Sequence, residues 1–367
     1  MNQKQKKIVL ALCGIAVLSL IAAGLYLACG RKSLQKNNPQ TDKQVQTKQQ
    51  ENEPQATKNP YEGMVKSELT GKYIKPSVAK KRPYAIMINN IEYAFRNQKG
   101  TSKADIIYEA LAGGITRMMA VYEDVSKVKK IGSVRSARHY YVQFAKEWDA
   151  IFCHFGHTKY AVSKIKKLGT NNLSGLSAIG GVVYARDLSI RAPHNVFTNG
   201  KKMKKGAKKL GYSLTRNSEA MAKHFNFANE DTEPANGKTA KSVTIPFSNY
   251  STCKMKYSAK SKTYKKYEYG QKHMDTYYKK QLAFKNVIIQ LVSESNIDHN
   301  GYQTMKLGNT SGKGYYYSDG KRISITWKRV EATNEMAYYD ESGNVLTINP
   351  GKTYIAVYPK NRQNLIK

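Results

Sequence analysis

Acidic residues are scarce in this chain of 367 residues: 26 Asp and Glu stand against 61 Lys and Arg, a formal net charge of +35. That balance excludes an acidic disordered protein. Cysteine is also rare, and four Cys in a chain of this length exclude a disulfide scaffold. Only one long apolar run is present, which excludes a multi-pass membrane protein. Hydrophobic residues make up 40% of the chain, enough for packed cores in about two to three domains.

The single apolar run covers residues 8–28 and follows three lysines. It is long enough to cross a hydrocarbon core of roughly 30 Å at about 1.5 Å per residue. Positive residues before such a run stay on the cytoplasmic side. We therefore expect the rest of the chain at the outer face of the bacterial cytoplasmic membrane.

The apolar run ends in Leu27-Ala28-Cys29-Gly30. This segment resembles the lipobox of bacterial lipoproteins, in which a small residue precedes a Cys that becomes lipidated. Ala28 and Cys29 fit the pattern, whereas Tyr26 stands where Leu, Val or Ile is usual. Lipidation of Cys29 is our prediction, and an uncleaved signal anchor is the alternative. Both tether the protein to the membrane.

The excess of positive charge favours an anionic partner. Nucleic acid is the usual partner of a basic protein, but we do not expect it for a chain tethered outside the cell. An anionic cell-wall polymer or a lipid-linked glycan is the predicted partner besides the membrane. Alternatively, the lysines only solvate the surface. We predict neither a cofactor nor a resident metal ion.

The fold class predicted from the sequence is α+β, with an N-terminal α/β domain followed by a smaller, mostly β domain. The stretch after Cys29 is rich in Gln, Lys, Asn and Thr, and it cannot bury enough apolar surface to fold. The predicted segments are a signal peptide or anchor (1–29), a polar linker (30–75), the α/β domain (76–232) and the β-rich domain (233–367).

Buried apolar runs predict strands, and apolar residues at helical spacing predict helices. In the first domain they alternate, which is typical of an α/β arrangement. We expect strands at 83–88, 116–122 and 150–155, helices at 138–148, 160–168, 201–210 and 218–225, and either element at 104–112. Short runs rich in Val, Ile, Tyr and Thr predict later strands at 264–269, 286–292, 321–327, 336–339, 345–348 and 354–357.

Common catalytic motifs are absent, among them the GxxxxGK[ST] loop, HExxH and GxSxG. Cys153, His154 and His157 have a spacing that suggests a metal site at first. Because Cys153 and His154 are neighbours on an expected strand, they face opposite sides of it. The trio therefore does not predict a metal site.

Two segments use arginine where most of the chain uses lysine: GSVRSAR (132–138) and RDLSIRAPHN (186–195). The guanidinium fork binds phosphate or carboxylate with two hydrogen bonds. The first segment also precedes the helix expected from residue 138, and the N–H groups at a helix start attract anions. We predict a ligand-binding site formed by Arg135, Arg138, Arg191, His194, Asn195, Asp105 and Glu109.

Asp105 and Glu109 are among the few acids of the first domain. In one interpretation they balance the arginines, and the whole set is a structural ion-pair network. In another they hold a divalent cation beside an anionic substrate. A third interpretation needs only the arginines, which bind a phosphate-bearing or carboxylate-bearing component.

Four long segments resemble the YerB-like lipoproteins, a bacterial family with a domain of unknown function in two parts. They are RPYAIMINN (82–90), ADIIYEALAGGITRMMAVY (104–122), KIGSVRSARHYYVQFAKEWDAIFCHFG (130–156) and RAPHNVFT (191–198). Shorter matches such as PGKTYIAV (350–357) extend the resemblance to roughly residue 360. Family members often carry Asp where this chain has Asn89. The resemblance implies a lipoprotein with two parts, but no catalytic residue, because the family has no agreed activity.

A shorter pattern is similar to the LytR-CpsA-Psr phosphotransferases, which move glycans from polyprenyl pyrophosphate carriers to the cell wall. It consists of a strand, an Asp, another strand and Ser-x-x-Arg before a helix. This likeness implies a magnesium-dependent transferase that uses Asp105 with Arg135 or Arg138, although Ser136 replaces the Asp of the Pro-Arg-Asp in those enzymes. Our prediction is a binding lipoprotein of unknown molecular function; the transferase and a non-catalytic envelope assembly module are alternatives. Whether the protein is an enzyme stays open.

Overall fold

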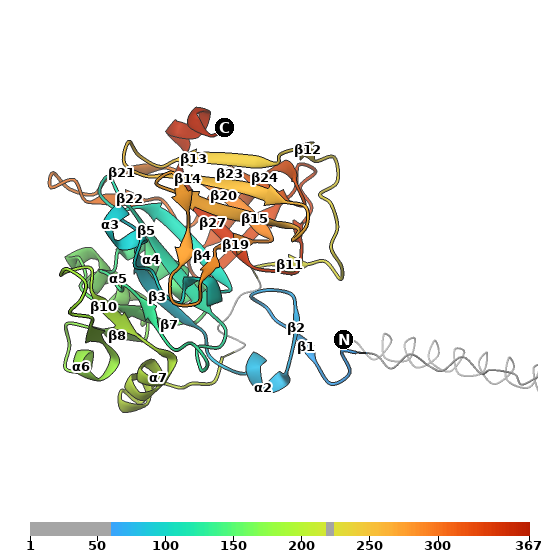
Figure 1. Cartoon of the computed structure of the whole chain (residues 1–367). Helices are drawn as coiled ribbons and strands as arrows, with labels where there is room; N and C mark the ends of the chain where they lie inside the picture. The colour runs from blue at the N-terminus through green and yellow to red at the C-terminus, as the bar shows by residue number, and fades with distance from the viewer. Residues whose placement is uncertain (1–59, 218–223) are drawn as a thin grey trace, which may run out of the picture. The chain divides into compact units, whose positions relative to one another are not determined.

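The computed structural model describes residues 60–217 and 224–367 (Figure 1). The apolar run 8–28, Cys29 and the linker up to residue 59 lie outside these ranges, and so does most of the helix expected at 218–225. Within the two described ranges, no helix is long and apolar enough to cross a membrane.

Residues 60–217 combine short strands with helices. The strands are β1 (Val65–Lys66), β2 (Tyr73–Ile74), β3 (Tyr84–Asn89), β4 (Ile106–Leu111), β5 (Thr116–Tyr122), β6 (Ile131–Gly132), β7 (Ile151–His154), β8 (Asn172–Ser174), β9 (Ala185–Arg186) and β10 (Val196–Thr198). The helices are α2 (Pro76–Ala79), α3 (Glu92–Phe95), the 3-10 turn η1 (Thr101–Lys103), α4 (His139–Glu147), α5 (Lys159–Leu168), α6 (Gly180–Val183) and α7 (Gly200–Lys209). The segment 104–112, which the sequence left open, contains strand β4.

Residues 224–367 consist of strands and one 3-10 helix, η2 (Lys360–Leu365). The strands are β11 (Asn226–Phe227), β12 (Lys238–Thr239), β13 (Ser242–Pro246), β14 (Thr252–Ser258), β15 (Thr263–Glu268), β16 (Gln271–Lys272), β17 (Met274–Asp275), β18 (Lys280–Gln281), β19 (Ala283–Phe284), β20 (Asn286–Val292), β21 (Glu294–Asn296), β22 (Gln303–Met305), β23 (Thr310–Ser318), β24 (Lys321–Val330), β25 (Glu335–Tyr339), β26 (Thr347–Ile348) and β27 (Thr353–Pro359). Each strand expected after residue 242 overlaps one of these.

Both halves of the chain contribute to one eleven-stranded sheet, ordered β12-β24-β23-β20-β27-β4-β5-β3-β7-β8 with β25 beside β24. Strand β27 lies parallel to β20 on one side and parallel to β4 on the other. Figure 1 shows this junction, where the orange-red β27 meets the blue-green β4. The segments 76–232 and 233–367, which the sequence analysis treats as separate domains, therefore share a sheet.

The central strands are continuous apolar runs because both faces of the sheet are covered. Every residue of β3, β4, β5, β20 and β27 is buried. Strands β14 and β15 instead alternate between buried and more exposed residues, as strands with one wet face do. The chain thus combines helices with mixed sheets, in agreement with the α+β prediction.

Residues 60–75, which the sequence analysis assigned to the linker, pack against the folded part. Strands β1 and β2 pair as an antiparallel ladder. Leu69 is fully buried, and the Ser67 hydroxyl donates to the Glu123 carboxylate at 2.6 Å. The Gly351 N–H also donates to the Thr70 carbonyl at 2.7 Å, so that these contacts attach the segment despite a polar composition that suggests a linker.

The alternation of side chains assigns the polar residues of the central strands to opposite faces of the sheet. Arg117 lies opposite Asn89 on β3 and opposite Ala110 on β4. On β4, Tyr108 has the same parity as Ala110, and its hydroxyl donates to Glu147 of α4 at 3.0 Å. Glu109 has the other parity. Arg117 therefore belongs to the face that carries α4, and Glu109 belongs to the opposite face.

Candidate functional site

Arg117, Arg135, Arg138, Arg191 and His194 form a continuous basic group, which we call the arginine cluster. Burial, together with Arg138 and Arg135, lowers the pKa of Arg117 to about 9. Burial and Arg138 lower the pKa of Arg135. Burial, Arg135 and Arg191 lower the pKa of His194. The positive charge of neighbouring arginines thus disfavours the charged form of each of these three groups. A bound anion would offset this repulsion.

Three separate segments bring the arginine cluster together. Arg117 lies on β5, Arg135 and Arg138 lie in the loop that leads into α4, and Arg191 and His194 lie between β9 and β10. Backbone hydrogen bonds join these segments: Val134 N–H donates to the Val196 carbonyl at 2.8 Å, and Arg135 N–H donates to the Met87 carbonyl at 3.1 Å. The loops are therefore held by strand-like pairing to β3 and β10.

Arg117 is the most deeply buried member of the arginine cluster, with 5% of its surface exposed. Its Nη1 donates to the Ser136 carbonyl at 3.3 Å, and its Nε has no hydrogen-bond partner. A buried guanidinium without a carboxylate is costly, because it has lost water and gained no opposite charge. An anion bound next to it would remove that cost.

Arg135, Arg138 and Ser133 add donors in the loop between β6 and α4. Nη1 of Arg135 makes a long hydrogen bond of 3.4 Å to the Pro193 carbonyl, and its Nε is buried without a partner. Arg138 is the N-cap of α4, and its Nη1 donates to the Ala137 carbonyl at 3.0 Å. The Ser133 hydroxyl is buried and has no partner. The helix start therefore combines unused donors with the positive end of the helix dipole.

Other buried arginines of the chain are neutralised by carboxylates. Arg82 pairs with Asp149 at 3.0 Å, and Arg216 pairs with Glu123 at 3.2 Å. Arg329, which is 1% exposed, pairs with Glu147. Across residues 60–217 and 224–367, no member of the arginine cluster forms such an ion pair. The geometry of the cluster thus differs from that of a structural ion-pair network.

The outer part of the arginine cluster packs against Tyr93. The Arg191 guanidinium lies 5.0 Å from the centre of the Tyr93 ring, and the His194 ring lies 5.3 Å from it. The Asn89 amide donates to Nδ1 of His194 at 2.8 Å, which leaves the proton of the neutral imidazole on Nε2. Asn89 therefore orients a ring of the cluster.

The structure places Asn195 and Asp105 outside this arrangement. The Asn195 side chain accepts from Nη1 of Arg186 at 2.8 Å, so that it orients Arg186. The Asp105 carboxylate accepts from the Glu123 N–H at 2.8 Å at the start of β4. Burial raises the pKa of Asp105, and the nearby Lys352 opposes that shift. Among the described residues, neither side chain forms a hydrogen bond or ion pair with a side chain of the arginine cluster.

Glu109 belongs to a buried acid–lysine cluster with Asn90, Lys266, Glu268 and His273. Lys266 Nζ lies 3.1 Å from the Glu109 carboxylate and also pairs with Glu268. The Asn90 amide donates to both acids at 2.9–3.0 Å. All five side chains are fully buried. Burial and the neighbouring Glu268 raise the pKa of Glu109. An ammonium group therefore already occupies the position that a divalent cation would take at Glu109.

The interpretation in which Asp105 and Glu109 hold a divalent cation, one of the three that the sequence leaves open, finds no support in the geometry. Nowhere in the described ranges are three or more His, Cys, Asp or Glu side chains placed to hold a metal ion. In the trio Cys153, His154 and His157, the first two side chains have other partners. The His154 ring contacts the Gly156 carbonyl at 2.8 Å and the Asn172 side chain at 3.1 Å, while Cys153 contacts Met203.

Arg117 is absent from the site residues predicted from the sequence. It stands in the run TRMMAVY, which reads as an apolar strand. The one available signal was a guanidinium inside a strand whose other residues are apolar or small, because such a strand is buried and a buried charge needs a reason. Only the register of β5 with β3 places Arg117 beside Asn89 and near the loop that carries Arg135.

Comparisons with known proteins agree over most of the described chain. The model described as "Protein of unknown function (DUF3048) N-terminal domain" matches residues 69–213, and that of the DUF3048 C-terminal domain matches residues 243–355. "Putative lipoprotein YerB" of Bacillus subtilis (strain 168) is 32% identical over 297 residues, 80% of this chain and 86% of that protein. The crystal structure of YerB protein from Bacillus subtilis has a TM-score of 0.73 at 29% identity, and the match covers 83% of this chain and 99% of that one. The first matched range contains the whole arginine cluster.

Proposed function

The chain belongs to the DUF3048 family of YerB-like proteins, and from this premise we propose that it is a membrane-tethered lipoprotein that binds an anionic component of the cell envelope. The arginine cluster is the proposed binding site, and the ligand carries phosphate or carboxylate. Lipidation at Cys29, in the segment before the described residues, is the proposed tether. At the outer face of the cytoplasmic membrane, an anionic cell-wall polymer or a lipid-linked glycan is the nearest ligand of this kind.

One observation carries the proposal: three guanidiniums converge at the start of α4 without a carboxylate to balance them. Arg117 and Arg135 each hold a buried Nε without a partner, and Arg138 occupies the N-cap position of α4 without a side-chain capping bond. A phosphate oxygen accepts hydrogen bonds from a guanidinium fork and from helix N–H groups alike. The bound anion would satisfy these donors and remove the repulsion among the arginines.

The same geometry favours binding over phosphoryl transfer. A magnesium-dependent transferase needs acids beside the arginines to hold the metal ion against the substrate. Glu109 faces the other side of the sheet and contacts Lys266, while Asp105 contacts the backbone of Glu123. A purely structural assembly module would instead pair its buried arginines with acids, as Arg82 and Arg329 do.

Removal of Arg135 should separate binding from stability. We expect Arg135→Ala to weaken the binding of inorganic phosphate and pyrophosphate about tenfold to a hundredfold, since a hydrogen bond to a charged group contributes about 1.5–3 kcal/mol. The unfolding temperature should change little, because the side chain makes one long bond of 3.4 Å in the free protein. Isothermal titration calorimetry and thermal unfolding of the full chain measure the two quantities.

Arg96→Ala is the matched control for this experiment. Arg96 is exposed, and its one ion pair within residues 60–217 and 224–367 is with Glu92, at 3.6 Å along α3. Its removal should leave phosphate binding unchanged. If Arg135→Ala unfolds at a much lower temperature while phosphate binds as before, Arg135 has a structural role and the proposal is wrong.

A further inference from the structure

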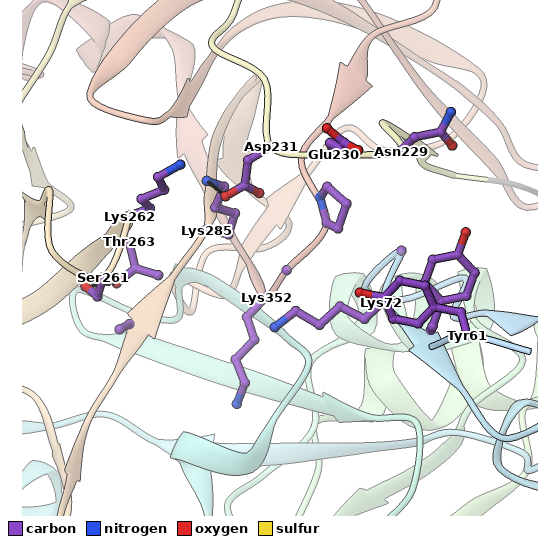
Figure 2. Close-up of a pocket in the computed structure, with 15 residues that line it drawn as sticks. Tyr61, Lys72, Asn229, Glu230, Asp231, Ser261, Lys262, Thr263, Lys285 and Lys352 are labelled. Atoms are coloured by element: carbon purple, nitrogen blue, oxygen red, sulfur yellow. Dashed lines mark hydrogen bonds and ion pairs between the residues drawn. The ribbon is translucent and has the colours of Figure 1, made fainter. Parts of the chain in front are cut away.

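A cavity of about 850 Å³ opens at a different place, and no residue of the arginine cluster lines it (Figure 2). Segments far apart in the chain form its wall. They are the stretch before and within β2, the loop after β11, the turn between β14 and β15, and the loop before β27. The lining includes the side chains of Tyr61, Lys72, Tyr73, Glu230, Lys285 and Lys352.

Two of the lysines that line this cavity, Lys72 and Lys352, form no ion pair with a carboxylate among the described residues, although the Asp105 carboxylate lies near enough to Lys352 to favour its charged form. Lys285 is balanced, because its ammonium lies 2.9 Å from Asp231 and 2.5 Å from Asp319. Lys352 donates to the backbone carbonyl of Ser102, which carries no net charge. Lys72 is exposed and, among the residues that the structure describes, forms no ion pair with a carboxylate. Lys72 and Lys352 can therefore both attract an anion.

Besides these charged groups, the cavity wall has an apolar section formed by a pair of tyrosines. The rings of Tyr61 and Tyr73 stack with their centres 4.1 Å apart and their planes 16° from parallel. They are 49% and 41% exposed. The rings cover one face of each other, and the Lys66 ammonium lies 5.8 Å from the centre of the Tyr73 ring. The exposed parts of the pair form an apolar section of the wall that a ligand ring can contact.

The third feature of the cavity, besides the lysines and the tyrosine pair, is a carboxylate. Glu230 lines the cavity and is exposed, and Figure 2 shows it at the upper edge, across from Lys72. A carboxylate accepts strong hydrogen bonds from hydroxyl groups. It would also repel a second phosphate. A ligand that fits all three features has one anionic group, one ring and several hydroxyls.

We propose that this cavity binds a phosphorylated sugar, with its phosphate at Lys72 and Lys352, its ring on the Tyr61–Tyr73 wall and its hydroxyls at Glu230. Lysine is an established phosphate ligand that acts as a point charge. None of these residues belongs to the arginine cluster. The proposal therefore stands or falls independently of anion binding at that cluster.

The electrostatics of Lys352 agree with an anion at this place. Burial lowers the pKa of Lys352 to about 8. The neighbouring Asp105 opposes that shift, and Lys103, Lys72 and Lys280 add to it. A phosphate beside the amine favours its protonated form, so binding should raise this pKa. Conversely, affinity should fall as the pH rises through and above 8.

The test uses the full chain carrying Arg135→Ala, so that binding at the arginine cluster contributes little. The probes are glucose 1-phosphate, glucose and glycerol 3-phosphate, and lysine side-chain NMR follows the Lys352 resonance. We expect glucose 1-phosphate to bind most tightly and to raise the Lys352 pKa. Lys72→Met should weaken this binding about tenfold or more, since it removes one charged hydrogen bond. Tyr73→Ala should weaken the binding of glucose 1-phosphate more than the binding of glycerol 3-phosphate, because only the former has a sugar ring.

Lys127→Met is the control, because Lys127 is exposed and lies outside the cavity lining. Binding of glucose 1-phosphate that is equal in Lys72→Met and Lys127→Met would overturn the proposal. Equal affinity for glucose 1-phosphate and glycerol 3-phosphate would overturn the sugar part. Because every protein in this test carries Arg135→Ala, the comparison between variants reports binding at the cavity and not at the arginine cluster.

Discussion

Replacement of Arg117 by methionine is expected to stabilise the free protein and to abolish its anion binding. Arg117 is buried, lacks a carboxylate and lies near Arg135 and Arg138, so its charge is unfavourable in the free state. An unbranched apolar side chain of similar length should raise the free energy of unfolding by about 1–3 kcal/mol. Chemical denaturation measures this change, and calorimetric titration with pyrophosphate measures the loss of binding.

The opposite result is expected for an arginine that is equally buried but paired. Arg329→Met removes the partner of Glu147 and leaves a buried carboxylate uncompensated, which should cost about 3–5 kcal/mol. If Arg117→Met also destabilises the protein by several kcal/mol, Arg117 is a structural residue. The arginine cluster would then be no binding site.

Replacement of Lys266 by methionine is expected to destabilise the whole described unit by about 3–5 kcal/mol. Lys266 is fully buried between Glu109 of β4 and Glu268 of β15, and its loss brings two carboxylates together without a cation. The acids belong to the two halves of the chain. Because β27 and β4 also join these halves in one sheet, we expect one unfolding transition that shifts as a whole.

Lys265→Met is the matched control for this second prediction. Lys265 is the neighbouring residue on β15 and has the other parity, on the more exposed side of the strand. Its replacement should change stability by less than about 0.5 kcal/mol. Differential scanning calorimetry of the three proteins decides the matter. A Lys266→Met protein that unfolds like the Lys265→Met protein would show that the buried acid–lysine cluster does not hold the halves together.

Strands with strong local patterns could be predicted from the sequence nearly to the residue. The run at 116–122 coincides with β5, and the run at 286–292 coincides with β20, since continuous apolar stretches bounded by polar turns leave little choice. The shared sheet could not be predicted. The contact of β4 with β27 joins residues about 250 positions apart, and nothing in either strand encodes the partner.

The candidate site was predictable only where residues stand together in the sequence. Arg135 and Arg138 share one loop, and Arg191 and His194 share another, so that arginine usage in a lysine-rich chain was a sufficient signal. Glu109 was grouped with them because it is a rare acid nearby in the sequence. Its position on the opposite face of the sheet follows from the strand register, which single-sequence patterns do not contain.

The central claim is that an anion binds at the start of α4 between the guanidiniums of Arg117, Arg135 and Arg138. A crystal structure of the full chain with tungstate, an electron-dense analogue of phosphate, tests this most directly. We predict tungstate density within hydrogen-bond distance of Nε of Arg117 and Nε of Arg135. Guanidiniums that turn to carboxylates while tungstate binds elsewhere, or not at all, would contradict the account.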